Sequence, residues 1–295
     1  MIRSILVPLD GSKESEAALP EVRRLVPEGG KVHLLHVIPV PTPPVGDEPT
    51  RFVDLPEQAL AYLADVRNRF KDLEGFDLVV SGEPEDRILR TALQYNMQLI
   101  AMGSHARTGV ARWLYGNVGE AVVRQSQLPV LLVPSGIDRP RRGISRILVP
   151  LDGSEHALSV LPTVEAVAER TLAEIVLLYV KPVVHDPSPQ WAFPTPLSVR
   201  TDPAHQLEEL ADRLEAQGRV AWSLIAHGDP VEEILRHARL QEVDLIAMAT
   251  HSRAGLERMV EGSVAERVLK ATHLPVILQK PVTAGVMAGM GGGYA

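Results

Sequence analysis

The chain has 295 residues, of which 45% are hydrophobic and 23% are charged, and this composition is typical of an ordinary globular protein. Its net charge of −7 and its low aromatic content of 4% argue against a protein that grips nucleic-acid phosphates or stacks on bases. Because there is no cysteine, disulfides, thiolate metal sites and cysteine nucleophiles are excluded. No apolar run approaches the roughly 20 residues of a membrane span, and residues 1–4 do not resemble a signal peptide, so we expect a cytoplasmic location.

One stretch of sequence occurs twice. Residues 5–12, Ile-Leu-Val-Pro-Leu-Asp-Gly-Ser, return unchanged as residues 147–154, and Leu-Pro-Val at 128–130 returns at 274–276. The chain is therefore two copies of one unit, and its length also predicts two domains at about 150 residues each. We expect domains at 1–134 and 146–281, a polar linker at 135–145, and a flexible glycine-rich tail at 282–295.

The first copy predicts strands alternating with helices. In chain order these are a strand at 5–9, a helix at 13–26, a strand at 32–38, a helix at 57–73, a strand at 77–81, a helix at 84–96 opened by Pro84, a strand at 99–102, a loop at 103–115, a helix at 116–126 and a strand at 130–133. The second copy repeats this order over residues 147–279. Parallel strands need helix-length crossovers, so each copy is predicted to be an α/β domain with a five-stranded parallel sheet covered on both faces.

The ligand-binding edge of such a sheet lies beyond the carboxyl ends of its strands, where the strand order reverses. Asp10 follows the first strand, Val37 ends the second, and Gly103 follows the fourth. Gly109 and Gly116 lie in the next loop, and Gly116 opens a helix whose N-terminus favours an anion. This arrangement is typical of a phosphate site, with Asp10 available to accept hydrogen bonds from ribose hydroxyls.

These residues resemble the universal stress proteins. The repeated Ile-Leu-Val-Pro-Leu-Asp-Gly-Ser, the strand ending in His-Val, the glycine loop and the closing Leu-Pro-Val-Leu-Leu-Val carry the likeness over almost the whole of both copies. The resemblance implies two tandem doubly wound sheets with strand order 3-2-1-4-5, a fold like that of the adenine nucleotide alpha hydrolases. It also implies a stress-response regulatory protein that binds ATP or another adenine nucleotide. Mg²⁺ is the ion that can be bound together with ATP.

The family's ATP-binding members carry Gly, two residues, Gly, nine residues, Gly, then Ser or Thr. The first copy matches this spacing with Gly103, Ala106, Gly116 and Asn117, and the second with Ala249, Ser252, Gly262 and Ser263, so neither motif is intact. If the second glycine is needed for a left-handed backbone, Ala106 and Ser252 cost about 1–2 kcal/mol each.

The strand ends and loops, together with the residues that the family resemblance implies, give the full candidate set for nucleotide contact. It comprises Pro8, Asp10, Val37, Gly103, Ser104, His105, Ala106, Arg107, Gly109, Gly116, Asn117 and Val118 in the first copy, and Pro150, Asp152, Val180, Ala249, Ser252, Arg253, Gly255, Gly262, Ser263 and Val264 in the second.

Several of these residues also have plainer interpretations. Asp10 and Asp152 are equally expected as turn residues, and the loop histidines and arginines as solvated side chains. His33 and His36, three residues apart on a strand, point to opposite faces, so they are not a metal pair. No catalytic set and no metal site is identified.

Three functions remain open: a nucleotide-binding regulator, an interaction module whose pockets have decayed, and a slow ATP hydrolase, which would need a base and Mg²⁺ ligands that the sequence does not reveal. The protein partner is unknown, and neither nucleic acid nor a membrane is expected. Both copies end in an apolar strand that would expose an edge, so we predict that residues 130–133 and 276–278 pair across a pseudo-twofold axis. The chain would then be an intrachain pseudo-dimer, able to form a homo-oligomer.

Overall fold

The computed structural model describes residues 1–40, 55–106, 113–114, 117–135, 143–181, 202–250 and 264–281. The first copy comprises β1 (Ser4–Pro8), the 3₁₀ turn η1 (Ser15–Ala17), α1 (Ala18–Leu25), β2 (Lys31–Ile38), α2 (Leu55–Arg69), β3 (Asp77–Ser81), α3 (Pro84–Gln94), β4 (Leu99–Ala106), β5 (Trp113–Leu114), α4 (Asn117–Gln125) and β6 (Val130–Pro134). The second comprises β7 (Arg146–Leu151), α5 (Glu155–Leu158), α6 (Leu161–Thr171), β8 (Glu174–Lys181), α7 (Pro203–Ala216), β9 (Ala221–His227), α8 (Pro230–Leu240), β10 (Leu245–Ala249), α9 (Val264–Ala271) and β11 (Val276–Gln279).

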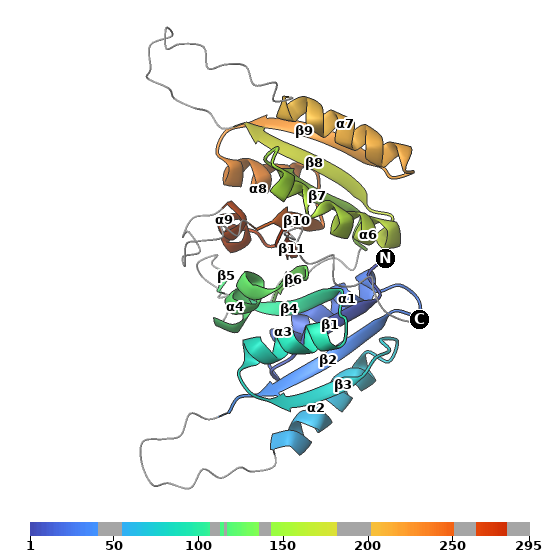
Figure 1. Ribbon diagram of the computed structural model, residues 1–295, viewed down its shortest axis with the longest axis vertical. Coiled ribbons are helices and arrows are strands. Elements are labelled where there is room, and N and C mark those ends of the chain that lie inside the picture. The colour runs from blue at the N-terminus through green and yellow to red at the C-terminus, as the bar shows by residue number, and fades with distance from the viewer. Residues whose placement is uncertain are drawn as a thin grey trace, which may run out of the picture.

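Each copy has the strand order expected from the family resemblance. The sheet runs β3-β2-β1-β4-β6 through the first copy and continues β11-β10-β7-β8-β9 through the second. When the main strands of each copy are numbered separately, leaving out the short strand β5, each half has the order 3-2-1-4-5 from its outer edge to the seam. Neighbouring strands within each of these runs are parallel. The prediction of two doubly wound α/β domains is confirmed, and Figure 1 shows the two copies stacked along the long axis of the molecule.

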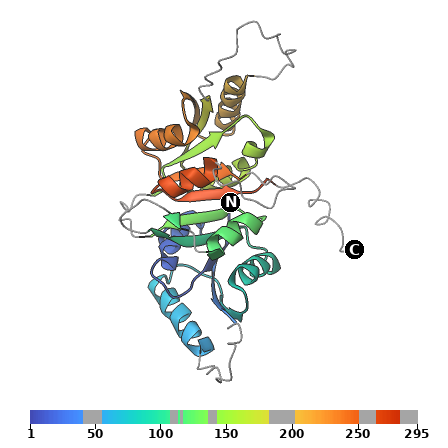
Figure 2. The same cartoon turned by 90° about the vertical axis from the view of Figure 1, so that its left-hand side faces the viewer.

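The two copies meet at the strand edge that the sequence predicts. β6 pairs antiparallel with β11, with Ile277 opposite Leu131 and Leu278 opposite Val130. Both views show the two strands side by side between the halves of the molecule (Figures 1 and 2). The seam strands are fully buried, because Leu131 and Ile277 are at most 1% exposed. The predicted intrachain pairing is confirmed.

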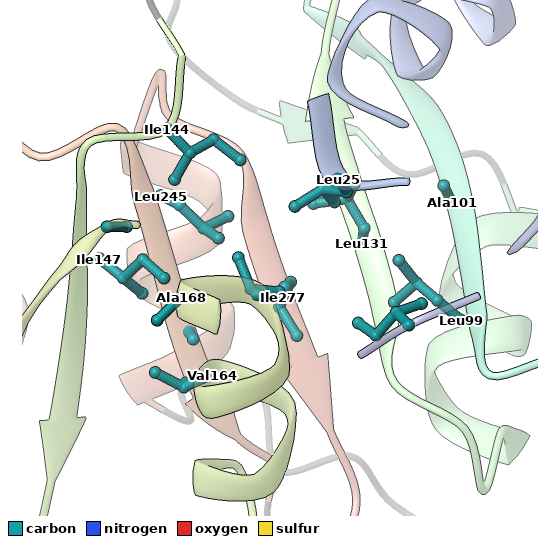
Figure 3. Packing of buried hydrophobic residues seen from close by; sticks show 14 of the residues in the cluster. Leu25, Leu99, Ala101, Leu131, Ile144, Ile147, Val164, Ala168, Leu245 and Ile277 are labelled. Atoms are coloured by element: carbon teal, nitrogen blue, oxygen red, sulfur yellow. The ribbon is translucent and has the colours of Figure 1, made fainter. Parts of the chain in front are cut away.

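The sheet separates two hydrophobic layers because alternate side chains of a strand point to opposite faces. Ile5 and Val7 of β1 pack in the layer with α1, α2, α6 and α7, whereas Leu6 packs in the layer with α3, α4, α8 and α9. Both layers continue across the seam, and Figure 3 shows Leu131 of the first copy facing Ile277 of the second within one cluster. Strands covered on both faces are nearly continuous apolar runs, which is how residues 5–9 read in the sequence.

Two expected elements differ from the structure. The helix expected at 13–26 is a 3₁₀ turn over Ser15–Ala17 followed by α1 from Ala18, because Ser12 and Ser15 use their hydroxyls to hold the preceding turn. The loop expected at 103–115 is also wrong in part. β4 continues to Ala106, and His105 and Ala106 pair antiparallel with Leu114 and Trp113 of the short strand β5.

Candidate functional site

The candidate site lies where the strand order of the first copy reverses. β1 pairs with β2 on one side and with β4 on the other, so their carboxyl ends meet at one edge of the sheet. Leu9 continues the ladder by donating its N–H to the carbonyl of Leu35, and the exposed Asp10 follows directly. In the second copy β7 lies between β8 and β10, and Asp152 holds the equivalent place.

Asp10 organises a tight turn at this edge. Its Oδ1 accepts hydrogen bonds from the backbone N–H of Ser12 at 2.9 Å and from the Ser12 hydroxyl at 2.5 Å. The Ser12 hydroxyl in turn accepts from the N–H of Ser15 at 3.1 Å. Gly11 supplies the left-handed backbone of the turn, with φ of +89°. The turn interpretation of Asp10 is therefore confirmed, and a ribose contact would be an additional role.

The second copy builds the same turn. Oδ1 of Asp152 accepts from the N–H and the hydroxyl of Ser154 at 2.9 and 2.5 Å, and Ser154 caps α5 by accepting from the N–H of Ala157 at 3.1 Å. An Asp-Gly-Ser sequence of this kind is an Asx turn followed by a serine cap. The serine hydroxyls were not among the candidate residues, although this local pattern is visible in the sequence.

The carboxylate of Asp10 is stabilised in its charged form. Partial burial raises the pKa of Asp10, but the hydrogen bonds that the carboxylate accepts from Ser12 and Ser15 outweigh this effect and leave the pKa below its ordinary value. Asp10 is consequently an ionised hydrogen-bond acceptor at neutral pH. Hydroxyl donors bind such a group more strongly than they bind a neutral acceptor.

The structure gives a reason for the glycine at position 103 that the sequence does not suggest. A Cβ added at Gly103 would lie 1.9 Å from the carbonyl oxygen of Glu14 and 2.9 Å from that of Ser15. The backbone at Glu14 and Ser15 thus lies in direct contact with β4 at Gly103. A bulky side chain at Gly103 would displace this backbone, so such a substitution would disturb the fold as well as any ligand site.

Ser104 carries a polar group with no partner in the described part of the chain. Its side chain is 4% exposed, and its Oγ is buried without a hydrogen bond, while its carbonyl accepts from the N–H of Ser135 at 3.0 Å. A buried hydroxyl left unpaired costs about 1–3 kcal/mol, and such a group calls for a partner from outside the protein or from water. Thr250, the matching residue after β10, instead directs its Oγ1 to the carbonyl of Gln279 at 3.5 Å.

The backbone of Ala106 is extended and does not have the left-handed conformation for which a glycine would be required. It lies in β4 and pairs with Trp113 of β5, and strand residues have extended backbone. The condition under which Ala106 would be strained, a left-handed backbone at this position, is therefore not met in this structure. Ser252, its counterpart in the second copy, lies outside the described residues.

The remaining candidates divide into three groups. Pro8, Val37, Pro150 and Val180 lie within strands, Ala249 ends β10, His105 lies in β4 beside Ala106, and Asn117, Val118 and Val264 lie at the starts of helices α4 and α9. Eight further candidates lie outside the described residues: Arg107, Gly109, Gly116, Ser252, Arg253, Gly255, Gly262 and Ser263. The described geometry therefore brings together the β1 turn and the end of β4, and not the loops beyond.

A polar cluster beside the Asp10 turn was not anticipated. The Arg69 guanidinium on α2 binds both carboxylate oxygens of Glu16, at 2.7 and 3.0 Å, and the Tyr62 hydroxyl donates to the same carboxylate at 3.1 Å. The bonds from Arg69 outweigh the opposing effect of burial and lower the pKa of Glu16, while burial and the Glu16 charge raise the pKa of Tyr62. This cluster ties η1 to α2. No local sequence signal marks a contact between residues 46 or more positions apart.

The two histidines of β2 have separate structural environments. The ring of His33 packs 3.9 Å from that of Phe76, and its Nδ1 accepts from the Phe76 N–H at 3.3 Å. His36 instead faces Tyr62 edge-on at 6.1 Å. Phe76 and Tyr62 belong to different hydrophobic layers, so the prediction that the histidines point to opposite faces is confirmed. Among the described residues no cluster of three His, Asp or Glu side chains could hold a metal ion, and no helix is long and apolar enough to cross a bilayer.

Comparison with known proteins gives one consistent result. The family model described as "Universal stress protein family" matches residues 1–134 and 143–280. A universal stress protein of Methanocaldococcus jannaschii is 32% identical over 139 residues, which are 46% of this chain and 81% of that protein. One of Mycobacterium bovis is 26% identical over 297 residues, covering 94% of this chain and 96% of the relative. The crystal structure of one from Archaeoglobus fulgidus shares the fold, with a TM-score of 0.73 at 22% identity over 94% of this chain and 96% of that one.

Proposed function

Because this chain belongs to the universal stress protein family, we propose that it is a stress-response regulator that binds ATP or another adenine nucleotide in at least one of its two copies. The observation that carries the proposal is the pair of polar groups at the edge where β1 and β4 end. Asp10 offers an ionised acceptor in an exposed turn, and Ser104 offers a buried hydroxyl that lacks a partner in the described structure. Together they suit a ligand that has both hydroxyl donors and oxygen acceptors.

The ribose and the phosphates of a nucleotide each have a matching group in the first copy. The ribose hydroxyls are donors that suit the Asp10 carboxylate, and the phosphate oxygens are acceptors that suit the Ser104 hydroxyl. The N–H groups at the start of α4, at Asn117, supply further donors together with the positive end of the helix dipole. Glu120 in the first turn of α4 opposes an anion there, which favours a binding site of modest affinity.

Binding and release of a nucleotide would regulate the protein by stabilising the η1 and β4 region. Asp10 and Gly103 both contact the backbone or side chains of residues 12–15, so a ligand held at Asp10 also orders this segment. The stability gained follows the ratio of free ligand to dissociation constant, and it is about 2.7 kcal/mol at a hundredfold excess. Mg²⁺ would accompany ATP by coordinating its phosphates and by reducing their charge.

The purified protein tests the proposal directly. Denaturing the protein as isolated and separating the released small molecules should reveal ATP, ADP or AMP, and titration calorimetry with ATP should give a saturable signal. Adenosine is the control, because it has the ribose hydroxyls without the phosphates. A protein that releases no nucleotide and gives no heat with ATP, ADP or AMP contradicts the proposal.

An interaction module without nucleotide is the second candidate. The continuous sheet and the two hydrophobic layers that cross the seam favour it, since they make a rigid double unit without any ligand. A slow ATP hydrolase is the third candidate, and the phosphate released from ATP with Mg²⁺ distinguishes it from a pure binding protein. The titration thus separates a nucleotide-binding protein from the interaction module, and phosphate release separates the hydrolase from both.

A further inference from the structure

We infer that the two copies are not equivalent, and that the chain binds one adenine nucleotide, in the first copy. This inference rests on the proposed function and assigns its site. Although the two copies share an identical eight-residue motif and an identical Asx turn, their surroundings at the carboxyl edge differ in three independent ways.

The first difference is the space above the turn. A Cβ added at Gly153 would lie 3.2 and 3.3 Å from the ring carbons of Pro203 and 3.9 Å from the side-chain oxygen of Gln206. The N-terminal turn of α7 therefore lies over the second Asp-Gly-Ser turn. A Cβ added at Gly11 would meet no described atom within 4 Å. Asp152 is itself exposed, as Asp10 is, so the contact with α7 narrows the space beside the second turn on one side, whereas no described residue does so at Gly11.

The second difference is the contact between the turn and the sheet. In the first copy Gly103 lets the backbone of Glu14 come into close contact with the end of β4. The second copy has Ala249 at this place, at the end of β10, and its methyl group excludes an equally close approach. The second copy instead forms a regular helical turn, α5, after its Asx turn. The relative position of the Asp and the fourth strand, which a nucleotide would have to span, is thus set differently in the two copies.

The third difference is hydrogen bonding at the strand end. The buried Ser104 hydroxyl has no partner in the described structure. In the second copy Thr250 directs its hydroxyl to the carbonyl of Gln279, and the Gln279 side chain accepts from the Thr163 hydroxyl at 2.6 Å in a buried contact. At this strand end the second copy thus pairs its hydroxyl internally, while the first keeps a donor that an incoming phosphate oxygen would satisfy.

Matched substitutions in the full chain test this assignment. Asp10→Asn and Asp152→Asn each keep an acceptor for the Asx turn and remove the carboxylate, so each variant makes the same chemical change at its own turn. Titration with ATP and with AMP, together with native mass spectrometry, should give one nucleotide per chain. Asp10→Asn should weaken binding on the order of ten- to a hundredfold, as expected for loss of a hydrogen bond to a charged group. Asp152→Asn should leave the affinity unchanged.

Ser104→Ala provides a second, independent measurement. Removing an unpartnered hydroxyl should leave the melting temperature of the free protein unchanged or higher, and it should weaken ATP more than it weakens adenosine. Two nucleotides per chain, or a loss of affinity in Asp152→Asn but not in Asp10→Asn, would overturn the assignment and leave the proposed function standing. An absence of any nucleotide binding would overturn both.

Discussion

The Nε of Arg170, on α6 of the second copy, donates a hydrogen bond of 3.1 Å to the carbonyl oxygen of Val26, at the end of α1 in the first copy. This bond closes one face of the seam, where α1 and α6 lie against each other above the pairing of β6 with β11. Val26 is only 8% exposed. Its carbonyl would be left without this charged donor if the arginine were removed.

Replacing Arg170 with Met should therefore destabilise the whole molecule. We expect a loss of about 1–2 kcal/mol in the free energy of urea unfolding, since a charged donor to a buried carbonyl is removed while the side-chain volume is kept. Arg90→Met is the control, because Arg90 pairs with Asp86 in an exposed helical pair that contributes less than about 0.5 kcal/mol. An equal loss of unfolding free energy in the two variants would show that the hydrogen bond from Arg170 to Val26 contributes no more to stability than an exposed ion pair.

Gly103→Ala should be destabilising even without a ligand. The added Cβ would lie 1.9 Å from the Glu14 carbonyl oxygen, so the backbone must move at a cost of about 1–3 kcal/mol or more. Gly143→Ala is the matched control, since a Cβ there meets no described atom within 4 Å. Thermal and urea unfolding of both variants measure the difference. An unchanged stability in Gly103→Ala would mean that η1 does not rest on β4 in solution.

Ala106→Gly should not strengthen nucleotide binding. A gain would require a left-handed backbone at this position, but Ala106 is an extended residue of β4 that pairs with Trp113. Glycine in a strand instead loses roughly 0.5–1 kcal/mol of stability. Calorimetric titration of ATP into wild type and variant measures the effect. A fivefold or greater gain in affinity would show that the bound loop leaves the strand conformation.

Asp10 should contribute a pH-dependent part of the stability. Its pKa in the folded protein is lower than the ordinary value of 3.8, so the contribution is fully present above that value and is lost as the pH falls through the folded pKa. The difference in unfolding free energy between wild type and Asp10→Asn should be constant from about pH 7 to about pH 5 and should shrink below about pH 4. A difference that grows on acidification contradicts the hydrogen-bonded carboxylate.

Leu172→Gly should stabilise the protein. Leu172 ends α6 in a left-handed conformation with φ of +57°, and it is 88% exposed, so its side chain contributes little packing. Glycine relieves a left-handed cost of about 1–2 kcal/mol and loses part of it to the greater freedom of the unfolded chain, for a net gain of about 0.5–1 kcal/mol. Leu93→Gly, at an exposed position of regular α3, should lower stability instead.

The sequence predicts the scaffold well because its signals are local or repeated. The apolar run at 5–9, the proline that opens α3 at Pro84 and the Leu-Pro-Val stretches before β6 and β11 all indicate elements that the structure contains. The repeat additionally predicts that the two copies share one topology, and the exposed apolar edge predicts their pairing.

The site is less predictable because its deciding contacts join distant residues. The approach of Glu14 to Gly103 and the bond between Glu16 and Arg69 depend on how η1 packs on β4 and α2. No spacing in the sequence encodes the position of Pro203 over Gly153. The identical motifs at Asp10 and Asp152 predict identical turns, which the structure contains, whereas the contacts that distinguish the two copies involve residues far away in the sequence, such as Gly103 and Ala249.

The antiparallel pairing of β6 with β11 has a consequence for how the protein responds to dilution. In a chain with a single copy, an edge strand of this kind could pair only with a strand of a second molecule. The fraction of edge strands that are paired would then depend on the protein concentration. Here the partner strand belongs to the same chain, so the encounter is intramolecular and its effective concentration does not depend on the amount of protein present. The two halves should therefore stay paired even when the protein is at its lowest concentration in the cell, and a change in the amount of protein would not alter its architecture.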